Sequence, residues 1–276
     1  MRETLSSIWT WVATSLLILS WFPIMALVWL FDRDPIRYRT GRAFRMLGGA
    51  LSHLNPFWDI EVTGDVPTPK RQPFVVVCNH LSHADVPIIS RLPWEMKWVA
   101  KKELFDLPIA GWMMRMARDI PVKRSDRRSR AEVLVHARKA LEHDCPVMFF
   151  PEGTRSRDGQ IHRFANGPFG LAIKQNVPVL PLALDGTQDA LPKHSWKFKD
   201  PHTKMRLTVM EPIDTTGLTV DDADDLRIQV RRQIIEQVAE WRGEPVATVD
   251  ALMKAPDQPA NEPERKESVK PSADME

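Results

Sequence analysis

The feature that most constrains this chain is its N-terminal run from Thr4 to Phe31, which contains no charged side chain. A helix needs roughly 20 residues to cross the apolar core of a bilayer, and this run is longer. Four of the ten tryptophans lie in the run, toward both of its ends, as is typical of a membrane–water interface. The residues that follow, WLFDRDP, do not resemble a signal-peptide cleavage site. The sequence therefore predicts a membrane segment with a kink at Pro23.

A second helix is expected from Pro35 to Leu54, with apolar side chains on one face at helical spacing. Five arginines follow the membrane segment, and we expect them largely on the opposite face: Arg33, Arg37, Arg39, Arg42 and Arg45. Such a helix can lie in the lipid headgroup layer or pack its apolar face on the protein. If the first segment spans the bilayer, the positive-inside rule places the body of the protein in the cytoplasm. Residues 1–54 are thus expected to form an element of the inner (cytoplasmic) membrane, with the active site facing the cytoplasm.

Short apolar runs alternate with helical patterns between residues 55 and 243. Strands are expected at 59–63, 74–78, 97–100, 120–122, 146–150, 177–184 and 205–210. Helices are expected at 86–91, 105–118, 129–143, 168–175 and 221–242. The unbroken valines at 75–77 are typical of a strand that is buried on both faces. The alternation predicts an α/β domain with a mixed, partly parallel sheet flanked by helices.

The C-terminal residues 244–276 differ in composition, because they are rich in proline and acidic residues and contain no aromatic residue. Such a segment buries too little apolar surface to fold, so we expect disorder. The whole chain carries a net charge of only +2, which argues against a nucleic-acid partner. Two cysteines, Cys78 and Cys145, are too few for a disulfide framework.

The first candidate site is the sequence NHLSHAD at 79–85, directly after the valine strand. His80 and Asp85 can meet if His80 lies in the turn and Asp85 lies in the first helical turn, and Pro87 favours a helix start there. A carboxylate on one imidazole nitrogen fixes the tautomer and leaves the other nitrogen as a general base. The alternative is a polar turn with a structural role only.

Two rival chemistries use the same turn. Cys78, His80 and His83 could bind a metal, but their spacing matches no common zinc pattern, so we expect no metal. Ser82 could be a nucleophile, but it lacks the G-x-S-x-G elbow that positions one.

The second candidate site is the sequence FPEGTRSR at 150–157, again after an apolar strand. Gly153, Thr154 and Arg155 offer backbone donors, a hydroxyl and a guanidinium group, which together suit a phosphate. Glu152 would then orient Arg155 or a substrate hydroxyl. The alternative is a salt-bridged surface loop.

A basic stretch extends from Arg115 to Lys139, with nine Lys or Arg against three Asp or Glu. It could meet an anionic lipid, a substrate phosphate or a cofactor phosphate. For most of these charges a solvated helix is the simpler interpretation. Lys123 and Arg124 are the exception, because they end a short strand where sheet ligands bind.

These segments together resemble the glycerolipid acyltransferase family. NHLSHAD resembles the family motif N-H-x4-D, and FPEGTRS matches the third family motif. IPVKR and VPVLPLAL lie where the second and fourth motifs are expected, so the resemblance covers roughly residues 37–210. One position departs from the pattern, because the family often has F-K-x-G before the fourth motif and Ala165 replaces that lysine here.

The resemblance implies transfer of a fatty acyl chain from acyl-CoA or acyl carrier protein to a lysophospholipid. The leading acceptor is the sn-2 hydroxyl of lysophosphatidic acid, which would give phosphatidic acid in phospholipid biosynthesis without a cofactor. It implies that His80 is the general base and that Asp85 orients it. The residues that it implies for the acceptor phosphate are Glu152, Gly153, Thr154, Arg155 and Arg124.

Three other functions remain open at this point. The acceptor could be a different lysophospholipid, as in phospholipid remodelling. A membrane lipid hydrolase could use the same histidine and aspartate, but it would need a nucleophile or a metal cluster. A non-catalytic lipid-binding protein would be expected to have a damaged first or third motif, and both are intact.

Overall fold

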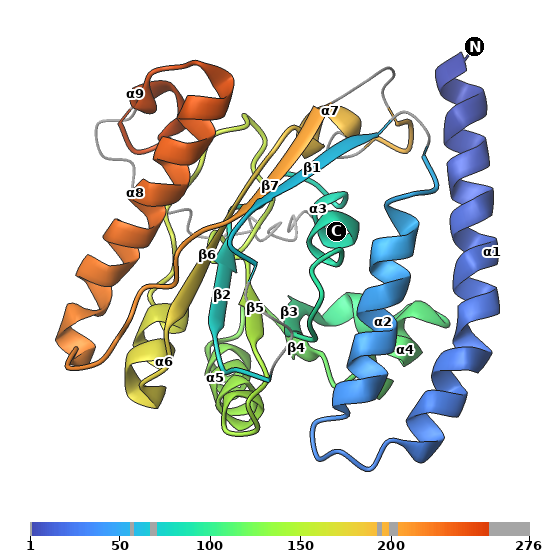
Figure 1. Cartoon of the computed structure of the whole chain (residues 1–276), viewed down its shortest axis with the longest axis horizontal. Helices are drawn as coiled ribbons and strands as arrows, with labels where there is room; N and C mark the ends of the chain where they lie inside the picture. Colours follow the sequence, from blue (N-terminus) through green and yellow to red (C-terminus); the bar gives the residue numbers. More distant parts are fainter. Residues whose placement is uncertain (1, 56–57, 67–70, 192–194, 199–203, 254–276) are drawn as a thin grey trace, which may run out of the picture.

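A computed structural model describes residues 2–55, 58–66, 71–191, 195–198 and 204–253. It shows a pair of N-terminal helices beside a seven-stranded sheet that has helices on both faces (Figure 1). The strands are β1 (Asp59–Gly64), β2 (Val75–Cys78), β3 (Lys97–Lys101), β4 (Ile120–Val122), β5 (Val147–Phe149), β6 (Val179–Asp185) and β7 (Lys204–Val209). The longer helices are α1 (Arg2–Phe31), α2 (Tyr38–Leu51), α4 (Ala110–Met116), α5 (Arg127–Leu141), α6 (Gly167–Gln175) and α8 (Ala223–Arg242). The short ones are α3 (Asp85–Ile89), α7 (Thr187–Ala190), α9 (Val246–Val249) and the 3₁₀ turns η1 (Lys102–Asp106) and η2 (Val220–Asp222).

The sheet is mixed, as the sequence predicts. The strand order is β1-β7-β6-β2-β5-β3-β4, and β6, β2, β5, β3 and β4 run parallel to one another. β7 pairs with β6 antiparallel, and β1 pairs with β7 parallel. Because β2 lies between β5 and β6, the carboxyl ends of these three strands meet at one edge of the sheet. Ligands of open α/β sheets bind at this edge.

Two apolar cores lie on the two faces of the sheet. On one face Val75 and Val77 pack with α5, α6 and α8. On the other face Val76 and Cys78 pack with Ile88 of α3 and its neighbours. Four apolar side chains at helical spacing on α8 are buried: Leu226, Val230, Ile234 and Val238. The central strand is therefore covered on both faces, which explains its unbroken valines.

The N-terminal helix α1 is a single element that continues through Pro23. Its length and composition would allow it to cross a membrane. It lies beside α2 at one side of the molecule, opposite α8 and α9 (Figure 1). Met25 of α1 packs with Leu47 of α2 and Met113 of α4 in a third apolar cluster. The helix ladder on both sides of Pro23 and these contacts keep α1 in one piece, so the expected kink does not divide the helix.

The expected position of the arginines on α2 is partly wrong. Arg45 is buried, and its Nη2 lies 2.6 Å from Asp119 Oδ2, with Glu95 Oε2 3.6 Å from its Nε. Arg42 donates a hydrogen bond to the carbonyl oxygen of Leu92. Because buried carboxylates need a cationic partner, α2 turns these arginines toward the domain rather than toward lipid. The apolar face of α2 packs on α1 and α4, so α2 lies between α1 and the sheet and connects them.

Residues 105–118 do not form the single helix that the sequence predicts. The segment is divided between η1 and α4, and Pro108 and Ile109 lie between them, with Ile109 at φ 62°. Gly111 allows α4 to return closely over η1, because a Cβ at this position would lie 2.3 Å from the carbonyl oxygen of Phe105.

The fold continues past the boundary that the sequence places at residue 243. Helix α9 follows, and Arg231 of α8 forms a buried ion pair with Asp250 at 2.5 Å. Ile161 also pairs with Asp250 in a β-bridge. Composition could not indicate this segment, because it is held by tertiary contacts, which are the Arg231–Asp250 ion pair and the bridge to Ile161. Residues 254–276 of the expected disordered tail lie outside the described residues.

Candidate functional site

The turn after β2 brings His80 and Asp85 together, as their spacing predicts. His80 Nδ1 lies 2.7 Å from Asp85 Oδ2, and Asp85 is the first residue of α3. The same oxygen accepts the backbone N–H groups of Leu81 and Ser82 at 2.8 and 3.0 Å. A carboxylate can only accept, so Nδ1 carries the proton and Nε2 keeps its lone pair. The arrangement is that of a histidine prepared to take a proton.

Two side chains from elsewhere in the chain complete this arrangement. The Thr187 hydroxyl, at the start of α7 after β6, donates to Asp85 Oδ1 at 2.5 Å. The Phe150 ring stacks on the His80 ring with 3.9 Å between centroids and 16° between planes. These contacts fix the aspartate and the imidazole plane. Sequence reasoning missed both, although both positions follow the strands that flank β2, and that placement was the available signal.

The loop after β5 is tied to the His80 turn through Glu152. Its Oε1 accepts the backbone N–H of His80 at 2.8 Å, and its Oε2 accepts the N–H of His162 at 3.0 Å. The backbone N–H of Ser156 donates in turn to the His80 carbonyl at 2.8 Å. Burial raises the pKa of Glu152 to about 8, although the two N–H groups favour the ionised form. Glu152 therefore positions the His80 backbone, a contact that the sequence did not suggest.

The remaining residues of this loop form a turn. Gly153 has φ 72°, and no atom lies within 4 Å of the place that a Cβ would take, so the glycine is required by its backbone angle. Thr154 is exposed and Arg155 is partly buried. Desolvation and the electrostatic effects of Arg155 and His80 lower the pKa of His83 to about 4, so Arg155 lies near the His80 turn. His83 is consequently neutral at neutral pH.

Arg124 reaches the same edge of the sheet from the end of β4. Desolvation lowers the pKa of Arg124; the charge of Glu103 opposes this effect and the charge of Arg155 adds to it. Two guanidinium groups that repel each other in this way create a region that favours an anion. The structure thus brings Arg124 and Arg155 into electrostatic range, on the side of the sheet that carries His80.

The rival metal site is not assembled. Cys78 points into the core, and burial raises the pKa of its thiol well above the usual value. Among the described residues, no group of three or more His, Cys, Asp or Glu side chains could hold a metal ion.

Asn79, the other member of the motif, bridges β2 and β6 through its side chain, which donates to the Leu184 carbonyl and accepts the Leu184 N–H.

Several proteins that are similar to this chain are named as acyltransferases. A chloroplastic 1-acyl-sn-glycerol-3-phosphate acyltransferase of Arabidopsis thaliana is 34% identical over 206 residues, which cover 74% of this chain and 56% of that relative. The alpha enzyme of the same name from Mus musculus is 31% identical over 223 residues, covering 79% of this chain and 78% of the relative. The crystal structure of the LPA acyltransferase PlsC from Thermotoga maritima has a TM-score of 0.74 at 27% identity, covering 88% of this chain and 98% of that one.

The family assignment follows from these matches. The chain spans about half the length of the chloroplastic relatives that it matches, and most of the length of the mouse relative. The family model described as Acyltransferase matches residues 59–185, which contain the His80 turn, Arg124, the Glu152 loop and β6. The chain belongs to the acyltransferase family.

Proposed function

We propose that this protein transfers a fatty acyl chain from a thioester donor, acyl-CoA or acyl carrier protein, to the sn-2 hydroxyl of lysophosphatidic acid. The product would be phosphatidic acid, made for phospholipid biosynthesis. The observation that carries the proposal is the His80–Asp85 pair beside the Glu152–Arg155 loop at one edge of the sheet. The names of the relatives support this choice of acceptor.

The proposed reaction needs one base and no covalent intermediate with the enzyme. Nε2 of His80 takes the proton of the acceptor hydroxyl as its oxygen attacks the thioester carbonyl. The tetrahedral intermediate then expels the thiolate, which recovers the proton from His80. Asp85 holds the imidazole and stabilises its charged form. General base catalysis typically contributes roughly 10²–10⁴-fold, so positioning and electrostatic stabilisation supply the rest.

The acceptor phosphate is proposed to bind beside Arg155, with the Gly153–Thr154 turn and Arg124 assisting. A guanidinium group binds a phosphate through two parallel charge-assisted hydrogen bonds. The mutual repulsion of the two arginines is relieved when a phosphate lies between them. The proposal involves no cofactor and no metal, since acyl-CoA and acyl carrier protein are substrates.

The membrane element is proposed to lie in one leaflet, with the active site facing the cytoplasm. Helix α1 is held to the body near its N-terminus, where Ser7 accepts the backbone N–H of Phe198 and Trp11 donates to the Trp196 carbonyl. It is held again near Met25. A helix fixed along its length to a folded domain cannot cross the bilayer without carrying that domain into the lipid. Its many exposed apolar side chains then enter one leaflet, which gives the site access to lipid substrates.

The test is an acyl-transfer panel with the purified full chain in detergent. Several lysophospholipids that differ in headgroup are each offered with acyl-CoA and with acyl carrier protein donors. The proposal expects lysophosphatidic acid to have the highest kcat/KM. A higher kcat/KM for a zwitterionic lysophospholipid would contradict the proposed acceptor, and hydrolysis of the donor without transfer would contradict the reaction.

A further inference from the structure

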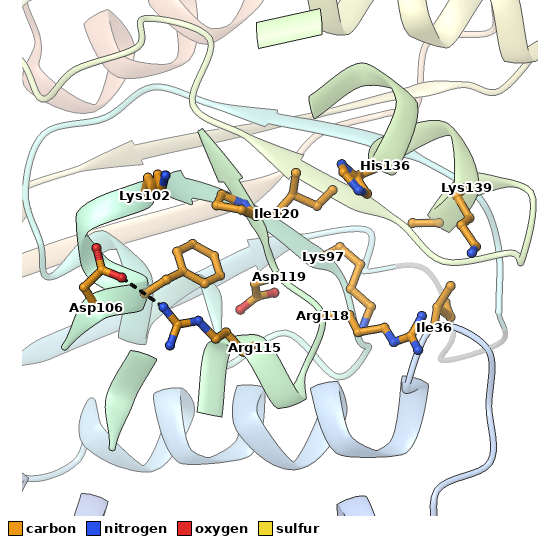
Figure 2. Close-up of a pocket in the computed structure, with 13 residues that line it drawn as sticks. Ile36, Lys97, Lys102, Asp106, Arg115, Arg118, Asp119, Ile120, His136 and Lys139 are labelled. Carbon is orange, nitrogen blue, oxygen red and sulfur yellow. Dashed lines mark hydrogen bonds and ion pairs between the residues drawn. The ribbon is translucent and has the colours of Figure 1, made fainter. Parts of the chain in front are cut away.

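A cavity lies beside the edge strand β4 and shares no residue with the His80 site. Its volume is about 520 Å³, which is within the usual range for small-molecule sites. Figure 2 shows that side chains of η1, α4 and α5 surround it, while the N-terminal helices pass along one side. Phe105, Ile120 and Ile36 give it an apolar wall.

The acidic side chains of this cavity already have partners. Asp106 is paired with Arg115 at 2.9 Å, an ion pair drawn in Figure 2. Asp119 at the buried end is paired with Arg45 at 2.6 Å. Neither carboxylate is therefore available to neutralise the remaining cations.

Three cations remain on the rim. Lys102, Arg118 and Lys139 line the cavity and are exposed, and none of them forms an ion pair with another part of the chain that the structure describes. His136 of α5 lies near Lys139 in Figure 2. Like charges gathered in one concave site repel one another, and an anion relieves that repulsion. Three of the Lys and Arg residues of the basic stretch 115–139, Arg115, Arg118 and Lys139, line this cavity.

The cavity also borders the lipid-facing surface. Ile36, in its wall, belongs to the connection between α1 and α2. Helix α4, which supplies Arg115, also exposes Trp112, and the Trp112 ring lies 5.9 Å from Phe22 of α1. Tryptophan is enriched at the level of the lipid headgroups. The cationic rim is thus placed where phosphate headgroups are concentrated.

We propose that this cavity binds the headgroup of an anionic glycerophospholipid of the surrounding membrane, at a site separate from the acceptor loop. The phosphate contacts Arg118 and Lys139, while Lys102 lies on the opposite side of the cavity in Figure 2, and the glycerol and first methylenes contact the apolar wall. Asp119 links the site to Arg45 of α2, so a bound lipid also fixes the membrane element against the sheet. The inference rests on the proposed membrane placement, and it does not depend on the proposed reaction.

A binding measurement on the full chain in neutral detergent tests this proposal. Dihexanoyl phosphatidylglycerol, dihexanoyl phosphatidylcholine and inorganic phosphate are titrated separately, and binding is followed by calorimetry. The test variant is Arg118→Gln/Lys139→Gln. The control variant is Arg127→Gln/Lys174→Gln, which removes the same charge from exposed positions outside the cavity.

Phosphatidylglycerol is expected to bind more tightly than either other probe. Its affinity should fall about tenfold or more in the test variant, because a hydrogen bond to a charged group is worth about 1.5–3 kcal/mol, and it should change little in the control variant. Equal losses in both variants would show non-specific attraction and overturn the proposal. Equal affinity for inorganic phosphate would show an anion site without lipid recognition, and equal affinity for phosphatidylcholine would show apolar binding alone. Each result is obtained without turnover, so failure of the proposed reaction is distinguishable from failure of this proposal.

Discussion

At the scale of single residues, the site is organised around the carboxylate of Asp85. It accepts hydrogen bonds from His80, from two backbone N–H groups and from Thr187, and it is fully buried. Four donors hold the buried carboxylate in one orientation, and its hydrogen bond to His80 then fixes the orientation of the imidazole ring. Positioning of the His80 imidazole therefore depends on residues from two separate strand ends.

Thr187 is expected to contribute through this hydrogen bond. Thr187→Val keeps the shape of the side chain but removes the donor, so one Asp85 oxygen is left unsatisfied. We expect kcat to fall about tenfold or more, since a hydrogen bond to a charged group is worth about 1.5–3 kcal/mol. Thr187→Ser should recover most of the activity, and steady-state kinetics would show it. An unchanged kcat in the valine variant would mean that this bond does not position Asp85.

Glu152 is expected to make stability depend on pH. Its folded-state pKa, raised to about 8, exceeds the ordinary value of 4.5, so its contribution to stability is fully present below about pH 4.5 and is lost as the pH rises through about 8. Denaturant unfolding of the wild type and of Glu152→Gln across this range measures the effect. The free energy of unfolding of the wild type should fall relative to the variant as the pH rises. A constant difference would contradict the buried, protonatable state of Glu152.

The sequence predicted His80 and Asp85 because both belong to one short turn with a helix start at its end. It did not identify Thr187, because its partner Asp85 lies far away in the chain and is reached only when β6 pairs with β2. Glu152 was identified as a candidate residue, but its hydrogen bonds to the backbone N–H groups of His80 and His162 were not predicted. Every residue except proline has a backbone N–H group, so the sequence cannot indicate which one a carboxylate will bind.

At the scale of elements, α2 is fixed to the sheet by buried charge. Arg45 contacts Asp119 and Glu95, and Lys97 Nζ donates to Glu95 at 2.7 Å. Gly41 is required for this approach, because a Cβ there would lie 1.9 Å from Glu95 Oε1. Helical periodicity identified the apolar face of α2, but it could not show that arginines on the other side would meet buried carboxylates.

Breaking this network should destabilise the protein strongly. Arg45→Met leaves Asp119 buried without its cation, a change that typically costs about 3–5 kcal/mol of unfolding free energy. Arg232→Met is the matched control, because it breaks an exposed pair with Glu236 and should change little. Chemical denaturation in detergent measures both. Equal effects of the two substitutions would contradict the structural role of the α2 attachment.

At the scale of the whole molecule, the proposed placement of α1 in one leaflet can be tested by labelling. Glu3→Cys and Glu244→Cys each introduce an exposed thiol, and the two natural cysteines are buried. Because α1 lies along the body, both thiols should react with a membrane-impermeant maleimide from the same side of the membrane. Inside-out and right-side-out vesicles provide the comparison. Labelling of the two positions from opposite sides would show that α1 spans the bilayer.

The partly parallel sheet and the edge at which the site lies could be predicted, since continuous valines and alternating helices indicate a parallel sheet. The antiparallel pairing of β7 with β6 and the parallel pairing of β7 with β1 could not be predicted, because the pairing of distant strands depends on tertiary packing. The segment after residue 243 was missed for the same reason, as Arg231 and Asp250 meet only in the folded domain.

The most direct test of the central claim is the turnover of purified His80→Ala with saturating lysophosphatidic acid and acyl-CoA. Thermal unfolding and vesicle binding equal to those of the wild type would establish that the variant is folded. We predict a loss of about 100-fold or more, because general base catalysis contributes roughly 10²–10⁴-fold, and a similar or somewhat smaller loss for Asp85→Asn. A folded His80→Ala protein that kept more than about a tenth of wild-type turnover would contradict His80 as the general base.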